Sequence, residues 1–194
     1  MAGYVLGHAA ILDGRNALQT QSYGSESRGG AAKSDIVISD TEILDLAPAE
    51  SDVLIALAQP ALDKYAPSLK QDGILVYESD LVRVPSTLPP LPYSERDGVR
   101  ISETSSEPAH DLPRAFGLPA TEIARTTFGR DVVANVIVVG FLAGLLNVPT
   151  RSSLHRAISE SVPPKTVEMN LQAFEEGFRR GNQERPRALK NACA

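Results

Sequence analysis

Two short apolar runs on either side of a helix-like segment constrain the fold of this 194-residue chain more than any other feature. Residues 53–58 are Val-Leu-Ile-Ala-Leu-Ala, and residues 74–77 are Ile-Leu-Val-Tyr. Uninterrupted runs of this length between turn residues are typical of strands that are buried on both faces. Between them, Pro60 opens a helical stretch over residues 61–69. The order strand, helix, strand predicts a βαβ unit with a right-handed crossover, and therefore a parallel sheet.

The segments around this unit are mostly helical. Residues 132–146 are apolar nearly all round, which predicts a buried helix, and Gly140 and Gly144 within it would let another element approach closely. The other expected elements are a helix over 3–14, strands over 17–20 and 34–39, helices over 120–128 and 152–161, and a last helix ending near Gly181. Together they predict an α/β fold, Rossmann-like, with a mostly parallel sheet flanked by helices and the C-terminal helices packed together.

The chain is expected to form one domain over residues 1–181. A long polar excursion over residues 85–119 interrupts it and contains seven prolines. Only residues 99–101, Val-Arg-Ile, have strand character within that excursion. Residues 182–194 are polar and basic and include Pro186, so they are expected to form a frayed C-terminal tail.

The bulk composition argues against several functional classes. A net charge of −5 gives no electrostatic footprint for nucleic acid or for an anionic membrane surface. The N-terminal residues lack the basic and apolar regions of a secretory signal, and the apolar run over 132–146 is too short to span a bilayer. The only cysteine, Cys193, can form no disulfide within the chain and cannot hold a zinc ion or an iron–sulfur cluster unaided. These features predict a cytoplasmic protein.

The most informative local feature is the loop between the two strands expected near the N-terminus. It contains Tyr23, Gly24, Glu26, Arg28, Gly29 and Gly30. Consecutive glycines can turn successive backbone N–H groups toward an anion, and Arg28 adds a planar fork suited to carboxylate or phosphate. Glu26 could instead pair with Arg28 and hold the loop in shape. The residues alone leave two interpretations open, a tight turn stapled by its own ion pair and a site for an anion or a partner.

No other residues form a recognisable catalytic or metal-binding constellation. His8, His110 and His155 have no acidic partner at a typical spacing, and the serines of the loop lie in no Gly-x-Ser-x-Gly elbow. We therefore assign no catalytic residue and no metal ligand to the chain. Asn135 is a polar residue in an otherwise apolar helix, and we expect it to have a structural role, bonded to a buried backbone group or placed at an interface.

The loop, Tyr-Gly-x-Glu-x-Arg-Gly-Gly, also carries a family resemblance. With the strand over 34–40 and Glu42-Ile43 after it, the loop resembles the gamma subunit of 2-oxoacid:ferredoxin oxidoreductases, and it looks most like the 2-oxoglutarate-type gamma chains. The resemblance covers most of the chain in the family's order, through 52–57, Tyr65, 73–82, 118–124, 134–136, Gly140, Asn170, Ala173-Phe174 and Gly177. The loop is its specific part, because aliphatic strands occur in many folds.

Two departures from the family pattern are visible. Members begin with a first strand and a Gly-x-Gly-Gly-Gln-Gly loop, whereas Met1-Ala2-Gly3 falls inside what should be the following helix. Either the start lies upstream of Met1, or this variant lacks the first strand and the glycine loop. The polar segment over 102–116 is also longer than the usual link, and it would suit a contact specific to one complex.

The resemblance implies a subunit that supplies no chemistry of its own. Enzymes of this family carry out CoA-dependent oxidative decarboxylation of a 2-oxoacid to an acyl-CoA. Their thiamine diphosphate, magnesium and 4Fe–4S clusters sit on other subunits. The implied partners are alpha-, beta- and delta-type subunits, with ferredoxin or another electron acceptor reached through them.

For this chain the resemblance slightly favours 2-oxoglutarate or an aryl-glyoxylate as substrate. A gamma chain packs on the catalytic subunits, so the loop with Tyr23 and Arg28 is expected to contact them or to shape CoA access. Two other classes stay open, a free-standing nucleotide- or CoA-binding module and an assembly protein without catalytic partners.

Overall fold

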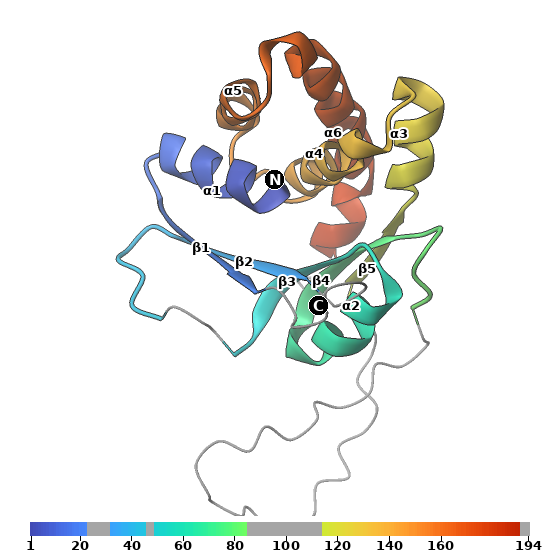
Figure 1. The fold of residues 1–194 in the computed structure, drawn as a ribbon. Coiled ribbons are helices and arrows are strands. Elements are labelled where there is room, and N and C mark those ends of the chain that lie inside the picture. Colours follow the sequence, from blue (N-terminus) through green and yellow to red (C-terminus); the bar gives the residue numbers. More distant parts are fainter. Residues whose placement is uncertain (23–31, 46–48, 85–113, 191–194) are drawn as a thin grey trace, which may run out of the picture.

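The computed structural model describes residues 1–22, 32–45, 49–84 and 114–190 as one layered body (Figure 1). A parallel sheet lies in the middle of it, with helices on both sides. The sheet has the order β3-β4-β5, and its strands are β3 (Ser51–Ala56), β4 (Leu69–Glu78) and β5 (Arg114–Leu118). The helix α2 (Gln59–Tyr65) connects β3 to β4, so the βαβ unit predicted from the two apolar runs is confirmed.

Alternate residues of β4 face the two sides of the sheet. Ile74 and Val76 pack into the core beneath the main helical layer, whereas Leu75 packs with Leu62 of α2 on the opposite side. All three β4 residues are at most 6% exposed. An apolar run without polar alternation is therefore what a strand covered on both faces requires.

The two N-terminal strands form a separate antiparallel hairpin. β1 (Asn16–Ser22) pairs with β2 (Lys33–Ser39) in a register that runs from Asn16 opposite Ser39 to Ser22 opposite Lys33. The helix α1 (Ala2–Leu12) packs on this hairpin. A Cβ atom on Gly3 would lie 2.6 Å from Ser34 Oγ, which shows how closely α1 approaches β2.

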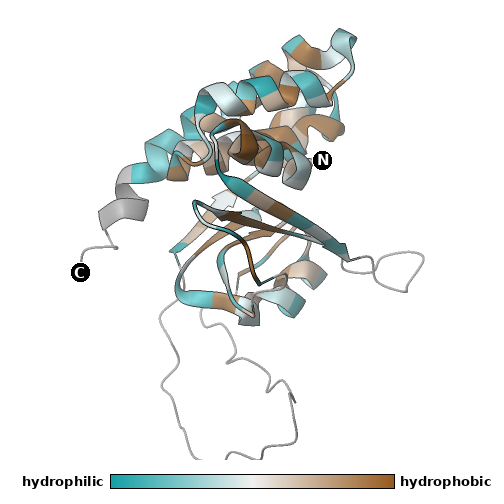
Figure 2. Cartoon of the chain, turned by 90° about the vertical axis from the view of Figure 1, so that its left-hand side faces the viewer, coloured by the Kyte–Doolittle hydropathy of each residue, from teal (hydrophilic) through white to brown (hydrophobic). Residues whose placement is uncertain are grey.

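The C-terminal part forms the main helical layer. Its members are α3 (Ala120–Phe128), α4 (Ala134–Leu146), α5 (Arg151–Ser161) and α6 (Val167–Lys190). The helix α4 is buried over almost its whole length, as its apolar sequence predicts, and its side chains form the centre of the larger core. Figure 2 shows hydrophilic residues along the outer side of this layer and hydrophobic residues where it faces the sheet. In the described ranges, no helix is both long enough and apolar enough to cross a membrane.

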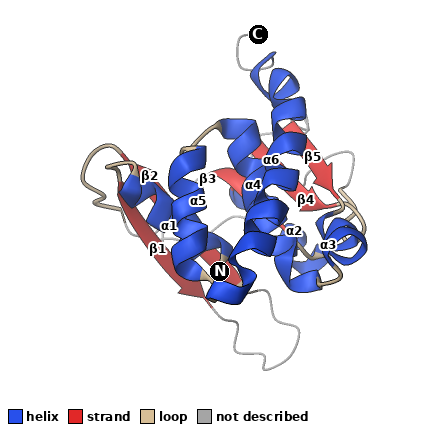
Figure 3. Ribbon diagram, turned by 90° about the horizontal axis from the view of Figure 1, so that it is seen from above, coloured by secondary structure: helices blue, strands red, loops and turns tan. Residues whose placement is uncertain are grey.

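The helices α4 and α6 cross in close contact through glycines on both helices (Figure 3). A Cβ atom on Gly140 would lie 2.1 Å from the carbonyl oxygen of Phe174, and one on Gly144 would lie 2.3 Å from that of Phe178. Gly177 and Gly181 of α6 make the same close approach from the other side, because a Cβ atom on each would lie 2.0 Å from a carbonyl oxygen of α4. The close approach expected at Gly140 and Gly144 is confirmed, and its partner is α6.

Two element boundaries differ from the expectation. The helix α6 continues to Lys190, where the sequence analysis placed a helix end near Gly181 followed by a tail. Gly181 is not a helix stop, because it lies in the crossing with α4 rather than in a left-handed turn. The strand β5 lies inside the segment expected to be a polar excursion. The strand expected over 99–101 lies outside the described residues.

Candidate functional site

The strands β1 and β2 flank the loop that the sequence analysis singled out. Ser22 and Lys33 are directly paired, so the two ends of the loop are held side by side. The residues of the loop itself, Tyr23, Gly24, Glu26, Arg28, Gly29 and Gly30, lie outside the described residues. Their role as an interface or CoA-side contact therefore stays a prediction.

Three elements meet at the base of that loop. Lys33 pairs with Asp35 at 2.8 Å, and its Nζ lies 5.3 Å from the ring centroid of Tyr65, at the end of α2. On the other side, Gln19 of β1 donates a hydrogen bond from Nε2 to Ser34 Oγ at 3.0 Å, close to the start of α1. The described residues on either side of the loop thus pair with each other and contact the start of α1 and the end of α2.

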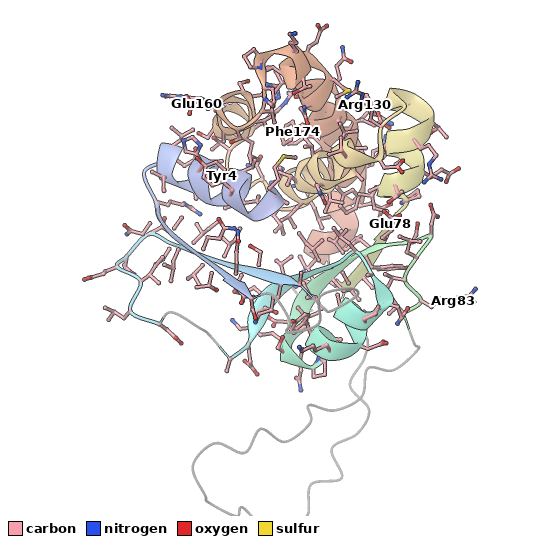
Figure 4. The ribbon with its side chains drawn as sticks, viewed as in Figure 1. Tyr4, Glu78, Arg83, Arg130, Glu160 and Phe174 are labelled. Carbon is pink, nitrogen blue, oxygen red and sulfur yellow. The ribbon has the colours of Figure 1, made fainter. Side chains whose placement is uncertain are left out.

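A second polar cluster lies where the parallel strands end. Glu78, the last residue of β4, is 2% exposed and lies beside the start of α3 (Figure 4). Its Oε2 accepts two hydrogen bonds from Thr121, one from the backbone N–H and one from Oγ1, each at 2.9 Å. Such a carboxylate satisfies a free N–H group at the helix N-terminus and complements its dipole. Oε1 of Glu78 is buried and has no hydrogen-bond partner among the described residues.

The same edge of the sheet is tied together by Gln59, in the first turn of α2. Its Oε1 accepts a hydrogen bond from the backbone N–H of Arg83 at 2.8 Å, and its Nε2 donates to the carbonyl oxygen of Arg83 at 3.3 Å. Ser79 N–H donates to the carbonyl oxygen of Leu118 at 3.2 Å. In open α/β sheets, ligands bind at the carboxyl ends of the strands, so this edge is the part of the parallel sheet best placed to face one.

Sequence reasoning missed Glu78 as a buried polar residue. The available signal was its position directly after the apolar run, where a carboxylate at a strand end can meet a following helix. Its partner Thr121 is 43 residues further along the chain, so the pairing itself cannot be seen in the sequence. Asn135, which we expected to be structural, lies half-buried in the first turn of α4, and its role stays a prediction.

A further hollow of the described surface lies elsewhere, between the end of α3 and α6. It is an open groove of about 930 Å³, lined by Phe128, Val167, Leu171 and Glu175 among others. Glu175 accepts a bidentate pair from Arg151 at 2.9 and 2.6 Å and also contacts His155. Burial raises the pKa of Glu175, but the hydrogen bonds from Arg151 and His155 outweigh burial and hold the pKa below its usual value.

The described residues bring together no cluster of three or more His, Cys, Asp or Glu side chains that could hold a metal ion. What they do provide is a fixed loop base, a buried carboxylate at the strand ends and a tightly packed helical layer. Such an arrangement can bind a ligand or a partner protein, and hold it in position, through backbone groups and single side chains.

Comparison with known proteins decides the family. The family model for pyruvate ferredoxin/flavodoxin oxidoreductase matches residues 1–180. The chain belongs to this family. The resemblance carried by the Tyr-Gly-x-Glu-x-Arg-Gly-Gly loop and the strands around it is therefore confirmed.

Individual relatives in the pyruvate ferredoxin/flavodoxin oxidoreductase family are similar over nearly the whole chain. This chain is 37% identical to the 2-oxoglutarate synthase subunit KorC of Methanocaldococcus jannaschii, over 92% of this chain and 84% of that protein. It is 38% identical to the KorC subunit of Methanothermobacter thermautotrophicus, over 91% of this chain and 85% of that protein.

A solved structure agrees with these relatives. The gamma subunit of a keto/oxoacid ferredoxin oxidoreductase from Geobacter sulfurreducens superposes with a TM-score of 0.72 and 34% identity, over 94% of this chain and 90% of that one. The expected α/β fold, with a parallel sheet between helices, is confirmed by this match.

Proposed function

We propose that this chain is the gamma-type subunit of a multi-subunit 2-oxoacid:acceptor oxidoreductase. The observation that carries the proposal is the match to a gamma subunit over nine-tenths of both chains, at 34% identity. In such a complex the chain completes the enzyme without supplying the groups that react. It packs on alpha-, beta- and delta-type subunits, which pass electrons to ferredoxin or another acceptor.

The complex would catalyse CoA-dependent oxidative decarboxylation of a 2-oxoacid to an acyl-CoA. We favour 2-oxoglutarate as the substrate, because two relatives at 37% and 38% identity are subunits of 2-oxoglutarate synthases. An aryl-glyoxylate is the next choice. The substrate pocket itself would lie mainly on the other subunits, so a substrate panel is needed to name the 2-oxoacid.

The cofactors of the complex would be held by its other subunits. A 4Fe–4S cluster needs four thiolate ligands, whereas this chain has a single cysteine. We therefore assign the clusters, and with them thiamine diphosphate and magnesium, to the partners. CoA enters as a substrate, and we assign to the loop with Arg28 the role of contacting a catalytic subunit or bordering the CoA path. Support for that role comes from the pairing of Ser22 with Lys33, which brings the two ends of the loop together at the end of the hairpin.

Affinity purification of the chain from its native host tests the proposal. Co-purifying proteins are identified by mass spectrometry, and iron and thiamine diphosphate are assayed in the eluate. Larger partners that carry both cofactors support the proposal, and a 2-oxoacid panel on the same eluate names the substrate. Recovery of a lone protein that binds CoA or a nucleotide would contradict the proposal and favour a free-standing binding module.

A further inference from the structure

The outer face of α1 carries a row of exposed apolar side chains. The inner face of this helix is buried through Val5, Leu6, Ala9 and Ala10. On the outer face, Met1 is 50% exposed, Tyr4 is 54% exposed and Ile11 is 58% exposed. The helix contains no Asp, Glu, Lys or Arg. A surface helix is normally polar on the side away from the core, so this outer face is unlike that of an ordinary surface helix.

His8 completes the row, which we call the α1 seam and define as Met1, Tyr4, His8 and Ile11. These positions are spaced three, four and three residues apart, which places them on one stripe of a helix. The same spacing forms the contact line between two helices that pack side by side. Another α-helix could therefore cover the whole α1 seam by packing along it.

The neighbouring helix α5 borders the α1 seam with polar groups. The ring of His8 lies 5.8 Å from the ring of Tyr4, and its Nε2 lies 3.3 Å from Glu160 Oε2. Glu160 also pairs with Arg156 at 2.9 Å. Figure 4 places Tyr4 on α1 and Glu160 on the adjacent α5. An apolar centre with a charged border on one side is the usual composition of a protein–protein interface.

The other exposed apolar side chains of the described residues do not form such a row. Leu44, Leu81 and Val132 are 84%, 59% and 64% exposed, but each lies on a different segment of the chain. Single exposed apolar residues are common in proteins and need no explanation. Aligned residues on one helix face are a different case, because a partner helix can cover all of them at once.

We propose that the α1 seam is a docking line for an α-helix of the catalytic subunits, a helix that presents aliphatic side chains to Tyr4 and Ile11. The proposal rests on the function proposed above. A second copy of this chain that met only at the α1 seam would bury too little area for a stable dimer. Three half-exposed large side chains present about 300 Å², whereas a stable interface buries about 800 Å² on each partner. The α1 seam therefore fits one part of a larger contact with a bigger subunit.

Two substitutions test the seam without weakening α1. Tyr4→Glu adds an acidic residue near the helix N-terminus, and Ile11→Lys adds a basic residue near its C-terminus, so both new charges suit the helix dipole. The matched controls are Leu81→Glu and Val132→Lys, which place the same charges at equally exposed apolar positions away from the seam. Each variant is expressed in the native host, and the partner subunits recovered with it are quantified. The melting temperature of each purified variant checks folding.

We expect Tyr4→Glu and Ile11→Lys each to lower partner recovery at least tenfold, while the two control variants recover partners like the original chain. All four variants should melt within a few degrees of it. Normal recovery with both seam variants would overturn the proposal, and so would equal losses in the controls. If the seam variants instead abolish a dimer of the isolated chain in light scattering, the occupant is a second copy and the assignment to a catalytic subunit is wrong. If the unmodified chain recovers no partner at all, the proposed function itself fails.

Discussion

Glu78 is the residue that joins the end of the parallel sheet to the helical layer. Its buried carboxylate accepts both donors of Thr121 at 2.9 Å. Thr121→Val removes the hydroxyl donor but keeps the shape of the side chain. We expect this variant to lower the free energy of unfolding by about 1–3 kcal/mol, because a buried carboxylate loses one of the two hydrogen bonds that it accepts from described residues. Urea denaturation of the purified chain measures the change.

Thr127→Val is the matched control for that experiment. Thr127 lies on the same helix, is exposed, and makes no side-chain hydrogen bond to another described residue. We expect a change within about 0.5 kcal/mol. Equal losses at the two positions would mean that helix propensity, and not the bond to Glu78, sets the result.

Arg28 is the residue through which the predicted loop site is tested. Replacing it with Ala should lower recovery of the partner subunits or raise the KM for CoA of the assembled complex. The fold should stay intact, because the described core is built from apolar side chains of the helices and strands. Circular dichroism checks the fold, and steady-state kinetics check the CoA step. A variant that assembles normally and shows unchanged CoA kinetics would remove the role assigned to the loop.

At the scale of single residues, the sequence identifies candidate residues more readily than it identifies the contacts that those residues make. The loop with Arg28 stands out because glycines, an arginine and an acidic residue lie together over a few positions. Glu78 does not stand out, because its importance comes from Thr121, which tertiary folding brings to it. The pair of Asp13 and Thr150 is a more extreme case, because its members are 137 positions apart in the sequence.

The crossing of α4 and α6 has no room for added side-chain atoms at its glycines. A Cβ atom on Gly177 would lie 2.0 Å from the carbonyl oxygen of Ile137, so Gly177→Ala forces the two helices apart. We expect a loss of about 1–3 kcal/mol in the free energy of unfolding. Thermal and urea unfolding of the purified chain measure it.

Gly7→Ala supplies a control with the same substitution in another helix. The nearest atom to the added Cβ would be Ala17 Cβ at 4.0 Å, which is ordinary contact. Alanine is the better helix former by about 1 kcal/mol, so this variant should be neutral or more stable. Destabilisation by Gly7→Ala to the same degree as by Gly177→Ala would contradict the close-packing account.

The junction between α1 and α5 depends on a charged cap. Asp13 accepts hydrogen bonds from Thr150 N–H and Thr150 Oγ1, each at 2.7 Å, and from Ser153 Oγ. Burial raises the pKa of Asp13, but these bonds outweigh burial and bring the pKa below its ordinary value. A lowered pKa means that the charged form stabilises the fold above the unfolded-state pKa of about 4. This stabilisation is lost as the pH falls through the folded-state pKa.

Asp13→Asn tests that linkage. We expect the variant to be less stable than the original chain at pH 7, by about 1 kcal/mol. The difference should shrink as the pH falls below about 4. Urea denaturation at a series of pH values gives the stability difference at pH 7 and its change with pH. A difference that stays constant down to pH 2 would show that the charge of Asp13 is not what stabilises this junction.

At the scale of elements, the sequence predicts those with a strong pattern of their own. The strands β3 and β4 are continuous apolar runs, and α3 ends at Gly129, which has a positive φ of 66°. The strand β5 has only five residues, of which just Phe116 and Leu118 are buried, so pairing with β4 defines it more than its sequence does. The predicted end of the last helix, near Gly181, was wrong, because a glycine can either end a helix or allow two helices to cross closely.

At the scale of the whole molecule, most of the architecture could be predicted. The sequence indicates the α/β class, the parallel sheet and the family, and the structure and the match to residues 1–180 agree. The α1 seam could not be predicted, because an apolar helix has no polar stripe that marks its exposed face, and tertiary packing alone decides which face is buried. The central claim concerns the molecule in its assembly, where this chain would complete an enzyme without providing its reactive groups.

Reconstitution tests that claim most directly. The partner subunits are purified without this chain, and CoA-dependent 2-oxoacid oxidation is measured for them alone, for this chain alone and for the two mixed. The account predicts no turnover and no bound iron for this chain alone, impaired turnover for the partners alone, and recovered activity on mixing. Turnover of a 2-oxoacid by the isolated chain, or full activity of the partners without it, would contradict the account.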